Sequence, residues 1–365
     1  MRTVTVPLGD RTYPIFVGNG LLPALGKHCK RLQLGRRCAV VSDKNVAPLY
    51  AESAMAALRD SGFEPILLTV PPGETSKSLK MVMKACDQLA AHRLERKSFI
   101  VALGGGVVGD LAGFLAAIYL RGVPFVQVAT TLLAQVDSSV GGKVGVNLPA
   151  GKNLVGSFYQ PRLVLCDLQT LETLPDREFR AGLAEVIKYG IIYDAPLFAR
   201  LERDLPRLLR RESKVLAEVV ARCCEIKAEV VGQDETETGL RAILNFGHTI
   251  GHAIENISGY GKYLHGEAIS IGQVAAARLS TELTGLPSAD AGRIKEIFLR
   301  AGLPVAIKLR GPAHARLLAA MRLDKKVSGG EIKFVLARQL GVVEPGHKVP
   351  EALIAKVLTT PAAGN

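Results

Sequence analysis

The chain lacks tryptophan and has few aromatic residues of any kind. Its 365 residues include 8 Tyr and 11 Phe, and aromatic residues make up 5% of the sequence. Stacking of bases on aromatic side chains is a main source of affinity for single-stranded nucleic acids. Basic residues are spread along the chain, and no known nucleic-acid-binding motif is present. These absences argue against a nucleic-acid-binding protein.

Cysteines are few, and long apolar runs are missing. The six cysteines are scattered and form no CxxC pair, which is typical of reduced thiols in a cytosolic protein. The first 18 residues alternate as in a strand and contain no apolar signal core, and the most apolar later region is interrupted by Asp110 and Arg121. We therefore expect a cytoplasmic protein with no export signal and no membrane span.

The chain does have a strong excess of positive charge. There are 46 Lys and Arg against 34 Asp and Glu, which gives a formal net charge of +12. Such a charge suits an anionic partner, and without nucleic acid the best candidate is a small phosphorylated or carboxylated substrate. With 48% hydrophobic residues, a chain of this length can bury a large core and is expected to form two domains.

The first half of the sequence alternates between two kinds of pattern. Short β-branched runs are separated by longer helical patterns, as in a parallel sheet covered by helices. The runs are CAVVSD at 38–43, EPILLTV at 64–70, SFIVALGGG at 98–106, PFVQVATT at 124–131 and RLVLCDL at 162–168. An α/β domain with a parallel sheet is therefore predicted over residues 1–175.

The pattern changes to mostly helical after residues 173–182. Apolar residues then recur at helical spacing through most of the chain. The segment at 326–341, KVSGGEIKFVLARQLG, interrupts this with a Gly turn and a β-rich run, which favours a small hairpin or an edge strand. A mostly α-helical domain is predicted over residues 176–365.

Three of the seven histidines fall within residues 242–268. His248 and His252 are four apart in a run with helical spacing, so they are expected on one face of a helix. The spacing resembles a zincin helix, but Thr249 occupies the place of the glutamate base. A metalloprotease is disfavoured, and the residues that complete a metal site stay open on spacing alone.

Gly104, Gly106 and Gly109 have GxGxxG spacing between an apolar strand and a helix. Glycines there let a pyrophosphate approach the backbone at a helix N-terminus. The pattern lies a hundred residues into the chain, whereas a dinucleotide fingerprint normally opens its βαβ unit. A tight turn that needs small residues explains the same glycines.

Eight separate stretches resemble one family. They lie at 71–78, 104–114, 121–147, 151–161, 182–192, 243–255, 265–272 and 324–326, and include GGGVVGDLAGF, GLAEVIKYGII, ILNFGHTIGHAIE and HGEAISIG. In this order they resemble the 3-dehydroquinate synthases of the sugar phosphate cyclase superfamily. The resemblance implies an N-terminal NAD-binding α/β domain, a helical C-terminal domain that binds metal and substrate, and a closed cleft between them.

The resemblance also implies a metal site. The divalent metal, usually zinc with cobalt as the alternative, would be held by Glu185, His248 and His265. Two imidazoles and a carboxylate are a common catalytic zinc set that leaves positions open for substrate oxygens. His252 is then no ligand and becomes a substrate or proton-relay contact.

The remaining site residues follow from the same motifs. Those expected around the substrate carboxylate and phosphate are Lys143, Lys152, Asn153, Arg241, Asn245, His252 and Lys325, with Asp137, Lys188 and Lys227 at its hydroxyls. Those expected at NAD are Asp43, Gly73, Glu74, Lys77, Gly106, Val107, Val108, Gly109, Asp110, Thr130, Thr131, Lys143, Lys152, Thr170, Leu171, Glu172 and Thr173. An arginine matching Arg121 reaches the neighbouring subunit's site in the family, which implies a homodimer.

The activity that the resemblance implies is a cyclisation in the shikimate pathway. 3-Deoxy-D-arabino-heptulosonate 7-phosphate becomes 3-dehydroquinate and phosphate through oxidation, elimination, reduction, ring opening and aldol closure, and NAD is recycled. Related cyclases act on sugars without a carboxylate, and a related polyol dehydrogenase would release NADH. Arg241 and Lys325 favour the dehydroquinate reaction, because its substrate is anionic at both ends.

Overall fold

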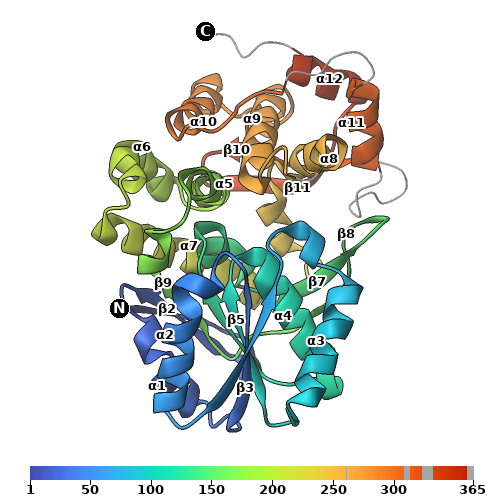
Figure 1. The fold of residues 1–365 in the computed structure, drawn as a ribbon. Helices are drawn as coiled ribbons and strands as arrows, with labels where there is room; N and C mark the ends of the chain where they lie inside the picture. The colour runs from blue at the N-terminus through green and yellow to red at the C-terminus, as the bar shows by residue number, and fades with distance from the viewer. Residues whose placement is uncertain (260, 308–312, 323–331, 360–365) are drawn as a thin grey trace. The chain divides into compact units, whose positions relative to one another are not determined.

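The computed structural model describes residues 1–259, 261–307, 313–322 and 332–359 (Figure 1). The chain divides into two compact units. Unit 1 comprises Met1–Pro175 and Ser213–Thr236, and unit 2 comprises Asp176–Glu212 and Glu237–Asn365. None of the described helices is long and apolar enough to cross a membrane.

Unit 1 contains a seven-stranded sheet. Its order is β1-β2-β9-β6-β5-β3-β4, with β1 antiparallel to β2 and the other neighbours parallel. The strands are β1 (Arg2–Val6), β2 (Tyr13–Gly18), β3 (Arg37–Asp43), β4 (Glu64–Val70), β5 (Phe99–Gly104), β6 (Phe125–Ala129) and β9 (Val164–Asp167). All five β-branched runs form parallel strands, which confirms the predicted parallel sheet.

Helices cover both faces of this sheet. Side chains alternate along a strand, so Cys38 and Val40 of β3 belong to one apolar core while Ala39 and Val41 belong to the other. The first core includes α1 (Leu25–Arg31) and α2 (Ala47–Asp60), and the second includes α3 (Leu79–Ala91) and α4 (Gly106–Ile118) (Figure 1). The central strands are therefore buried on both sides, which explains their continuous apolar runs.

Unit 1 also contains elements that the sequence pattern did not predict. A hairpin of β7 (Lys143–Leu148) and β8 (Gly151–Phe158) contacts α4, and a short π-helix, η5, spans Ala134–Ser138. Helix α7 (Ser213–Gln233) contacts β1, β2 and η5, so its segment groups with unit 1 although the sequence division had placed it in the second domain. The assignment of NAD binding to one domain and of metal and substrate binding to the other stays a prediction.

Unit 2 is mostly helical. Its elements are α5 (Asp176–Ile192), α6 (Ala195–Leu209), η7 (Leu240–Asn245), α8 (His248–Ser258), α9 (His265–Leu283), α10 (Ser288–Arg300), α11 (Ala313–Arg322), β10 (Lys333–Gln339), β11 (Val342–Lys348) and α12 (Glu351–Thr359). Strands β10 and β11 pair antiparallel, which confirms a hairpin in this region. An apolar core formed by α8, α9, α11, α12 and the hairpin fixes the two histidine-bearing helices.

Candidate metal centre and cofactor site

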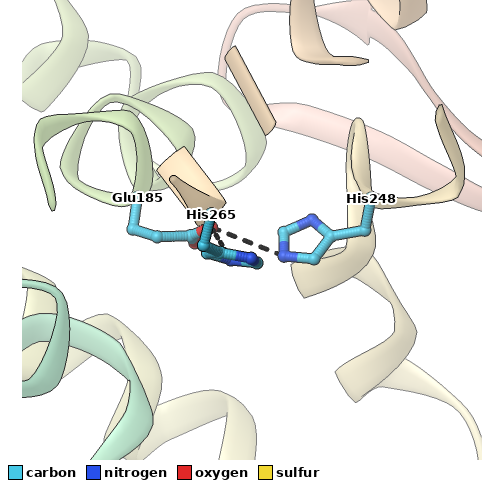
Figure 2. Close-up of side chains that lie close together, drawn as sticks. All are labelled: Glu185, His248 and His265. Atoms are coloured by element: carbon cyan, nitrogen blue, oxygen red, sulfur yellow. Dashed lines mark ion pairs between the residues drawn. The ribbon is translucent and has the colours of Figure 1, made fainter. Parts of the chain in front are cut away.

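Three helices of unit 2 bring one carboxylate and two imidazoles together (Figure 2). Glu185 comes from α5, His248 opens α8 and His265 opens α9. The Oε1 atom of Glu185 lies 3.4 Å from Nε2 of His248 and 3.4 Å from Nε2 of His265. One potential ligand atom from each residue lies within 4.8 Å of the others. These side chains therefore converge on a volume the size of one metal ion.

Two glycines allow the three helices to approach so closely. A Cβ on Gly266 would collide with the backbone carbonyl of Ala181, one turn before the metal-facing carboxylate on α5. A Cβ on Gly272 would collide with the carbonyl of Gly247 at the start of α8. Glycine permits such backbone contacts because it has no side chain. Gly266, the residue after His265, thus allows α9 to lie close to α5.

The hydrogen bonds of the histidines fit a metal site. The Nδ1 atom of His248 lies 3.1 Å from the carbonyl oxygen of Phe246, and Nδ1 of His265 lies 3.2 Å from Oε2 of Glu255. Both partners are acceptors, so Nδ1 carries the proton in the neutral ring and the lone pair is on Nε2. In both residues Nε2 is the atom that faces Glu185.

Glu185 is fully buried, with 0% of its side chain exposed. A buried carboxylate needs a cation, and Lys188, one turn along α5 and only 1% exposed, forms an ion pair with its Oε2. The donor set of two imidazoles and one carboxylate fits zinc or a similar divalent ion. The sequence-predicted residue Lys188 therefore lies directly beside these candidate metal ligands.

His252 lies one turn after His248 on α8, as the spacing predicted. Its ring centroid is 5.2 Å from that of His248 and 6.0 Å from that of His265. His252, Glu255 and His265 form a second group whose potential ligand atoms lie within 4.8 Å of one another. His252 thus lies beside the three candidate ligands and belongs to the second group.

The other sequence-predicted residues of unit 2 lie on η7. Arg241 is 1% exposed, and Asn245 donates a hydrogen bond to Oε1 of Glu237 at 2.7 Å. Element η7 ends three residues before His248, so the backbone places both residues next to the histidine helix. Lys325 lies outside the described residues.

The predicted cofactor residues of unit 1 gather at one edge of the sheet. Strands β4, β3, β5, β6 and β9 have the order 2-1-3-4-5, in which the connections after β3 and β5 lead in opposite directions. In open α/β sheets, ligands bind at the carboxyl ends of the strands at such a divergence. Asp43 ends β3, where its Oδ1 accepts hydrogen bonds from the N–H groups of Asn45 and Val46. Gly104 ends β5 on the other side of the divergence.

The glycine-rich turn follows directly after β5. Helix α4 begins at Gly106 with no side-chain cap, so its N-terminal N–H groups stay available to a phosphate. A Cβ on Gly109 would lie 2.6 Å from Oε1 of Gln127. Close packing of α4 on the sheet therefore accounts for a glycine at this position. Beside the turn, the N–H of Thr130 donates to the carbonyl of Gly104 at 3.0 Å. Within the described part of the chain its buried hydroxyl has no hydrogen-bond partner, as expected for a group that awaits a ligand.

Two buried lysines of unit 1 carry charge networks. Lys77 is 4% exposed, and its Nζ lies 2.7 Å from Oδ2 of Asp110 and 2.6 Å from Oδ1 of Asn153. Burial raises the pKa of Asp110, and the nearby Lys77 opposes this rise. Lys227 of α7 pairs with Oδ1 of Asp137 at 2.8 Å and also donates to its backbone carbonyl. The structure thus brings together five residues that the sequence assigned to cofactor or substrate, in two groups: Lys77 with Asp110 and Asn153, and Lys227 with Asp137.

The remaining predicted residues are more dispersed in unit 1. Lys143 begins β7 and is exposed, whereas Lys152 on β8 is half-buried. Arg121 is exposed on a turn with φ of +68°. The other NAD candidates lie after strand ends: Gly73 and Glu74 follow β4, Val107 and Val108 lie in the first turn of α4, Thr131 follows β6, and Thr170, Leu171, Glu172 and Thr173 follow β9.

Comparisons with known proteins agree with this arrangement. The family model for the 3-dehydroquinate synthase N-terminal region matches residues 67–181, and that for the C-terminal region matches residues 182–327. The chain is 49% identical over 359 residues to the 3-dehydroquinate synthase of Desulforamulus reducens, which covers 98% of this chain and 100% of the relative. The chain belongs to the 3-dehydroquinate synthase family.

Solved structures of related cyclases show the same fold with cofactors bound. One is 2-epi-5-epi-valiolone synthase from Streptomyces hygroscopicus with NAD+ and Zn2+, 29% identical, with a TM-score of 0.86 over 95% of each chain. Another is 2-deoxy-scyllo-inosose synthase with carbaglucose-6-phosphate, NAD+ and Co2+, 28% identical, with a TM-score of 0.90 over 98% of this chain and 99% of that one. Both relatives were thus solved with NAD+ and a divalent metal, Zn2+ in one and Co2+ in the other.

The sequence prediction missed Glu255, which hydrogen-bonds to the candidate ligand His265. The signal was present in retrospect, because His248, His252 and Glu255 follow one another at i, i+4 and i+7 on a single helix face. A glutamate on a helix is usually a solvated charge, so the spacing alone did not distinguish it.

Metal binding by this family member is expected to depend strongly on pH. Burial of the His265 ring lowers its pKa, but the carboxylates of Glu255 and Glu185 outweigh this effect and raise the pKa to about 10. A metal must displace that proton, because only the neutral imidazole is a ligand. We expect the apparent affinity of metal-stripped protein for Zn2+ to rise with pH, by roughly tenfold per unit for one released proton. Competition titrations with a chelator at several pH values below 10 measure this, and a flat profile would contradict it.

Proposed function

We propose that Glu185, His248 and His265 hold the divalent metal of a 3-dehydroquinate synthase, and that the carboxyl edge of the unit 1 sheet binds its NAD. The observation that supports this most directly is the convergence of one buried carboxylate and two correctly oriented imidazoles. The buried hydroxyl of Thr130 and the uncapped N-terminus of α4 support the cofactor assignment.

The activity of the chain is that of its family. It converts 3-deoxy-D-arabino-heptulosonate 7-phosphate to 3-dehydroquinate and phosphate, a step of the shikimate pathway and so of aromatic amino acid biosynthesis. The reaction is a phosphate-eliminating cyclisation without net oxidation, and the enzyme is a lyase.

The two cofactors supply the chemistry that side chains cannot. Held by Glu185, His248 and His265, the metal would supply Lewis acidity at a substrate hydroxyl, and NAD at the sheet edge would supply a reversible hydride acceptor. Lys188 adds positive charge beside the metal ligands and, in our assignment, binds a neighbouring hydroxyl. Lys227, oriented by Asp137, is assigned a second hydroxyl.

The remaining residues position a flexible substrate that carries two anionic groups. Arg241, Asn245 and His252 of unit 2 are assigned to its charged ends, together with Lys325. From unit 1 we assign Lys143, Lys152 and Asn153 to the same task. Fixing the conformation can supply a large part of the rate acceleration, and the departing phosphate can itself remove the proton required for elimination.

Assembly and location are further proposals. The chain is assigned to a homodimer in which Arg121 reaches the partner's site, supported by its exposure on a turn. A cytoplasmic location is supported by the six cysteines, none of which forms a disulfide in the structure.

NAD is expected to be needed only in catalytic amounts. Purified protein with a divalent metal, a trace of NAD and the heptulosonate phosphate should release phosphate and form 3-dehydroquinate over many turnovers. NADH absorbance should not accumulate, since the hydride taken from the substrate is given back. Stoichiometric NADH would identify a polyol dehydrogenase instead.

A further inference from the structure

Glu255 lies behind one of the proposed metal ligands. It is on the same face of α8 as His248 and His252, and 9% of its side chain is exposed. Its Oε2 lies 3.2 Å from Nδ1 of His265, on the side of the ring opposite the atom that faces Glu185. None of the roles assigned so far uses this carboxylate.

The two proposed imidazole ligands are supported by different acceptors. His248 has the neutral backbone carbonyl of Phe246 at its Nδ1, whereas His265 has a carboxylate. A charged acceptor makes a stronger hydrogen bond, and it makes the imidazole more electron-donating at its other nitrogen. The difference also has a structural reason, because His265 is 28% exposed and is the first residue of its helix. Such a side chain needs an external partner to fix its ring.

We propose that Glu255 is a positioning residue that fixes the ring orientation and tautomer of His265 and thereby strengthens metal binding. This inference rests on the proposed metal site. In this arrangement α8 supports the metal twice: once directly through His248, and once through the carboxylate of Glu255, about two turns later on the same face. The residue acts through His265 and does not contact the metal.

Direct ligation by Glu255 is the competing arrangement. A metal held by His252, Glu255 and His265 would use the second group of neighbouring ligand atoms. Two observations disfavour it: Nδ1 of His265 is already hydrogen-bonded to Glu255, and the fully buried Glu185 faces Nε2 of His248 and of His265. The carboxylate of Glu185, with 0% of its side chain exposed and two imidazoles beside it, needs a cation more than that of Glu255 does.

The test compares metal binding in Glu255→Ala, Glu255→Gln and the control Glu282→Gln in the full-length, NAD-supplemented protein. Glu282 is on the same helix as His265, but its carboxylate pairs with Lys356, and 48% of its side chain is exposed. Affinity for Zn2+ is measured by competition with a chelator at one fixed pH, and the visible spectrum of bound Co2+ reports ligand geometry. Melting temperatures of the metal-free proteins measure any purely structural effect.

We expect Glu255→Ala to bind Zn2+ about 10- to 100-fold more weakly and to show an altered Co2+ spectrum. Glu255→Gln retains an oxygen acceptor for Nδ1–H, so it should lose less affinity and keep a spectrum close to that of the wild type. Glu282→Gln should match the wild type in both measurements.

Three results would overturn the proposal. If Glu255→Ala keeps the wild-type Zn2+ affinity and Co2+ spectrum, the carboxylate does not support the site. The same conclusion holds if the only change in Glu255→Ala is a lower melting temperature of the metal-free protein. A loss in Glu255→Ala as complete as that in Glu185→Ala, together with a similar loss in His252→Ala, would make Glu255 a direct ligand. Full metal binding in Glu185→Ala would instead refute the proposed metal site itself.

Discussion

Replacing Glu185, His248 or His265 by Ala is expected to remove most of the bound metal and nearly all activity. Each residue would supply one of three protein ligands, so every single replacement leaves a two-ligand site. The loss should exceed the roughly 10- to 100-fold that follows removal of a group that only supports a ligand. Elemental analysis of purified, dialysed protein measures the metal, and phosphate release measures activity.

The Glu185 replacement needs a second variant because its carboxylate is also an ion-pair partner. Lys188 is 1% exposed, and removing one member of a buried ion pair destabilises a protein by about 3–5 kcal/mol. Glu185→Gln keeps the side-chain volume and an oxygen atom while removing the charge. It should fold better than Glu185→Ala and still bind metal poorly, which separates ligand loss from unfolding.

His252→Ala is the matched control for the three ligands. It changes the same residue type on the same helix as His248, one turn away. We expect it to retain full metal while losing activity, because the side chain is assigned to substrate. Full metal in His265→Ala, or none in His252→Ala, would contradict the ligand assignment.

Most of unit 1 could be predicted because its strands are buried on both faces. Burial of β3 and β5 between two helical layers gives continuous β-branched runs, which are easily recognised. The hairpin β7–β8 was not predicted, since its strands contain Gly145 and Gly156 and many exposed residues. The sequence also did not predict that α7 packs against β1, β2 and η5 of unit 1. A helical period shows which face is apolar but not which sheet or helix that face contacts.

The metal cluster could be predicted only in part from spacing. His248 and His252 share a helix face, but periodicity gives no reason to prefer either of them as a ligand. Their resemblance to family motifs favoured His248, and the structure adds that this residue faces the buried Glu185. Glu255 escaped prediction because its partner His265 is on another helix, and the contact depends on tertiary packing.

Arg241→Lys is expected to be strongly damaging although it keeps the positive charge. Arg241 is 1% exposed on η7 and is assigned to the substrate carboxylate. A guanidinium can bind a carboxylate through two parallel hydrogen bonds, which the single ammonium of lysine cannot reproduce. A charged hydrogen-bond pair contributes roughly 1.5–3 kcal/mol, so kcat/KM should fall by at least about 10- to 150-fold.

The loss should be specific to the carboxylated substrate. Metal content should stay near wild type, because the proposed ligands are Glu185, His248 and His265, and NAD affinity should also be retained. A melting temperature close to that of the wild type would show that the buried lysine is tolerated.

A sugar phosphate without a carboxylate provides the decisive comparison. It should be a poor substrate for the wild type, since it cannot form the charged hydrogen bonds that are assigned to the carboxylate. Arg241→Lys should then hardly change the slow rate on this sugar, because the group that the arginine is assigned to bind is missing. If Arg241→Lys instead reduces the rates on both substrates equally, Arg241 supports the fold or another part of the site and does not select the carboxylate.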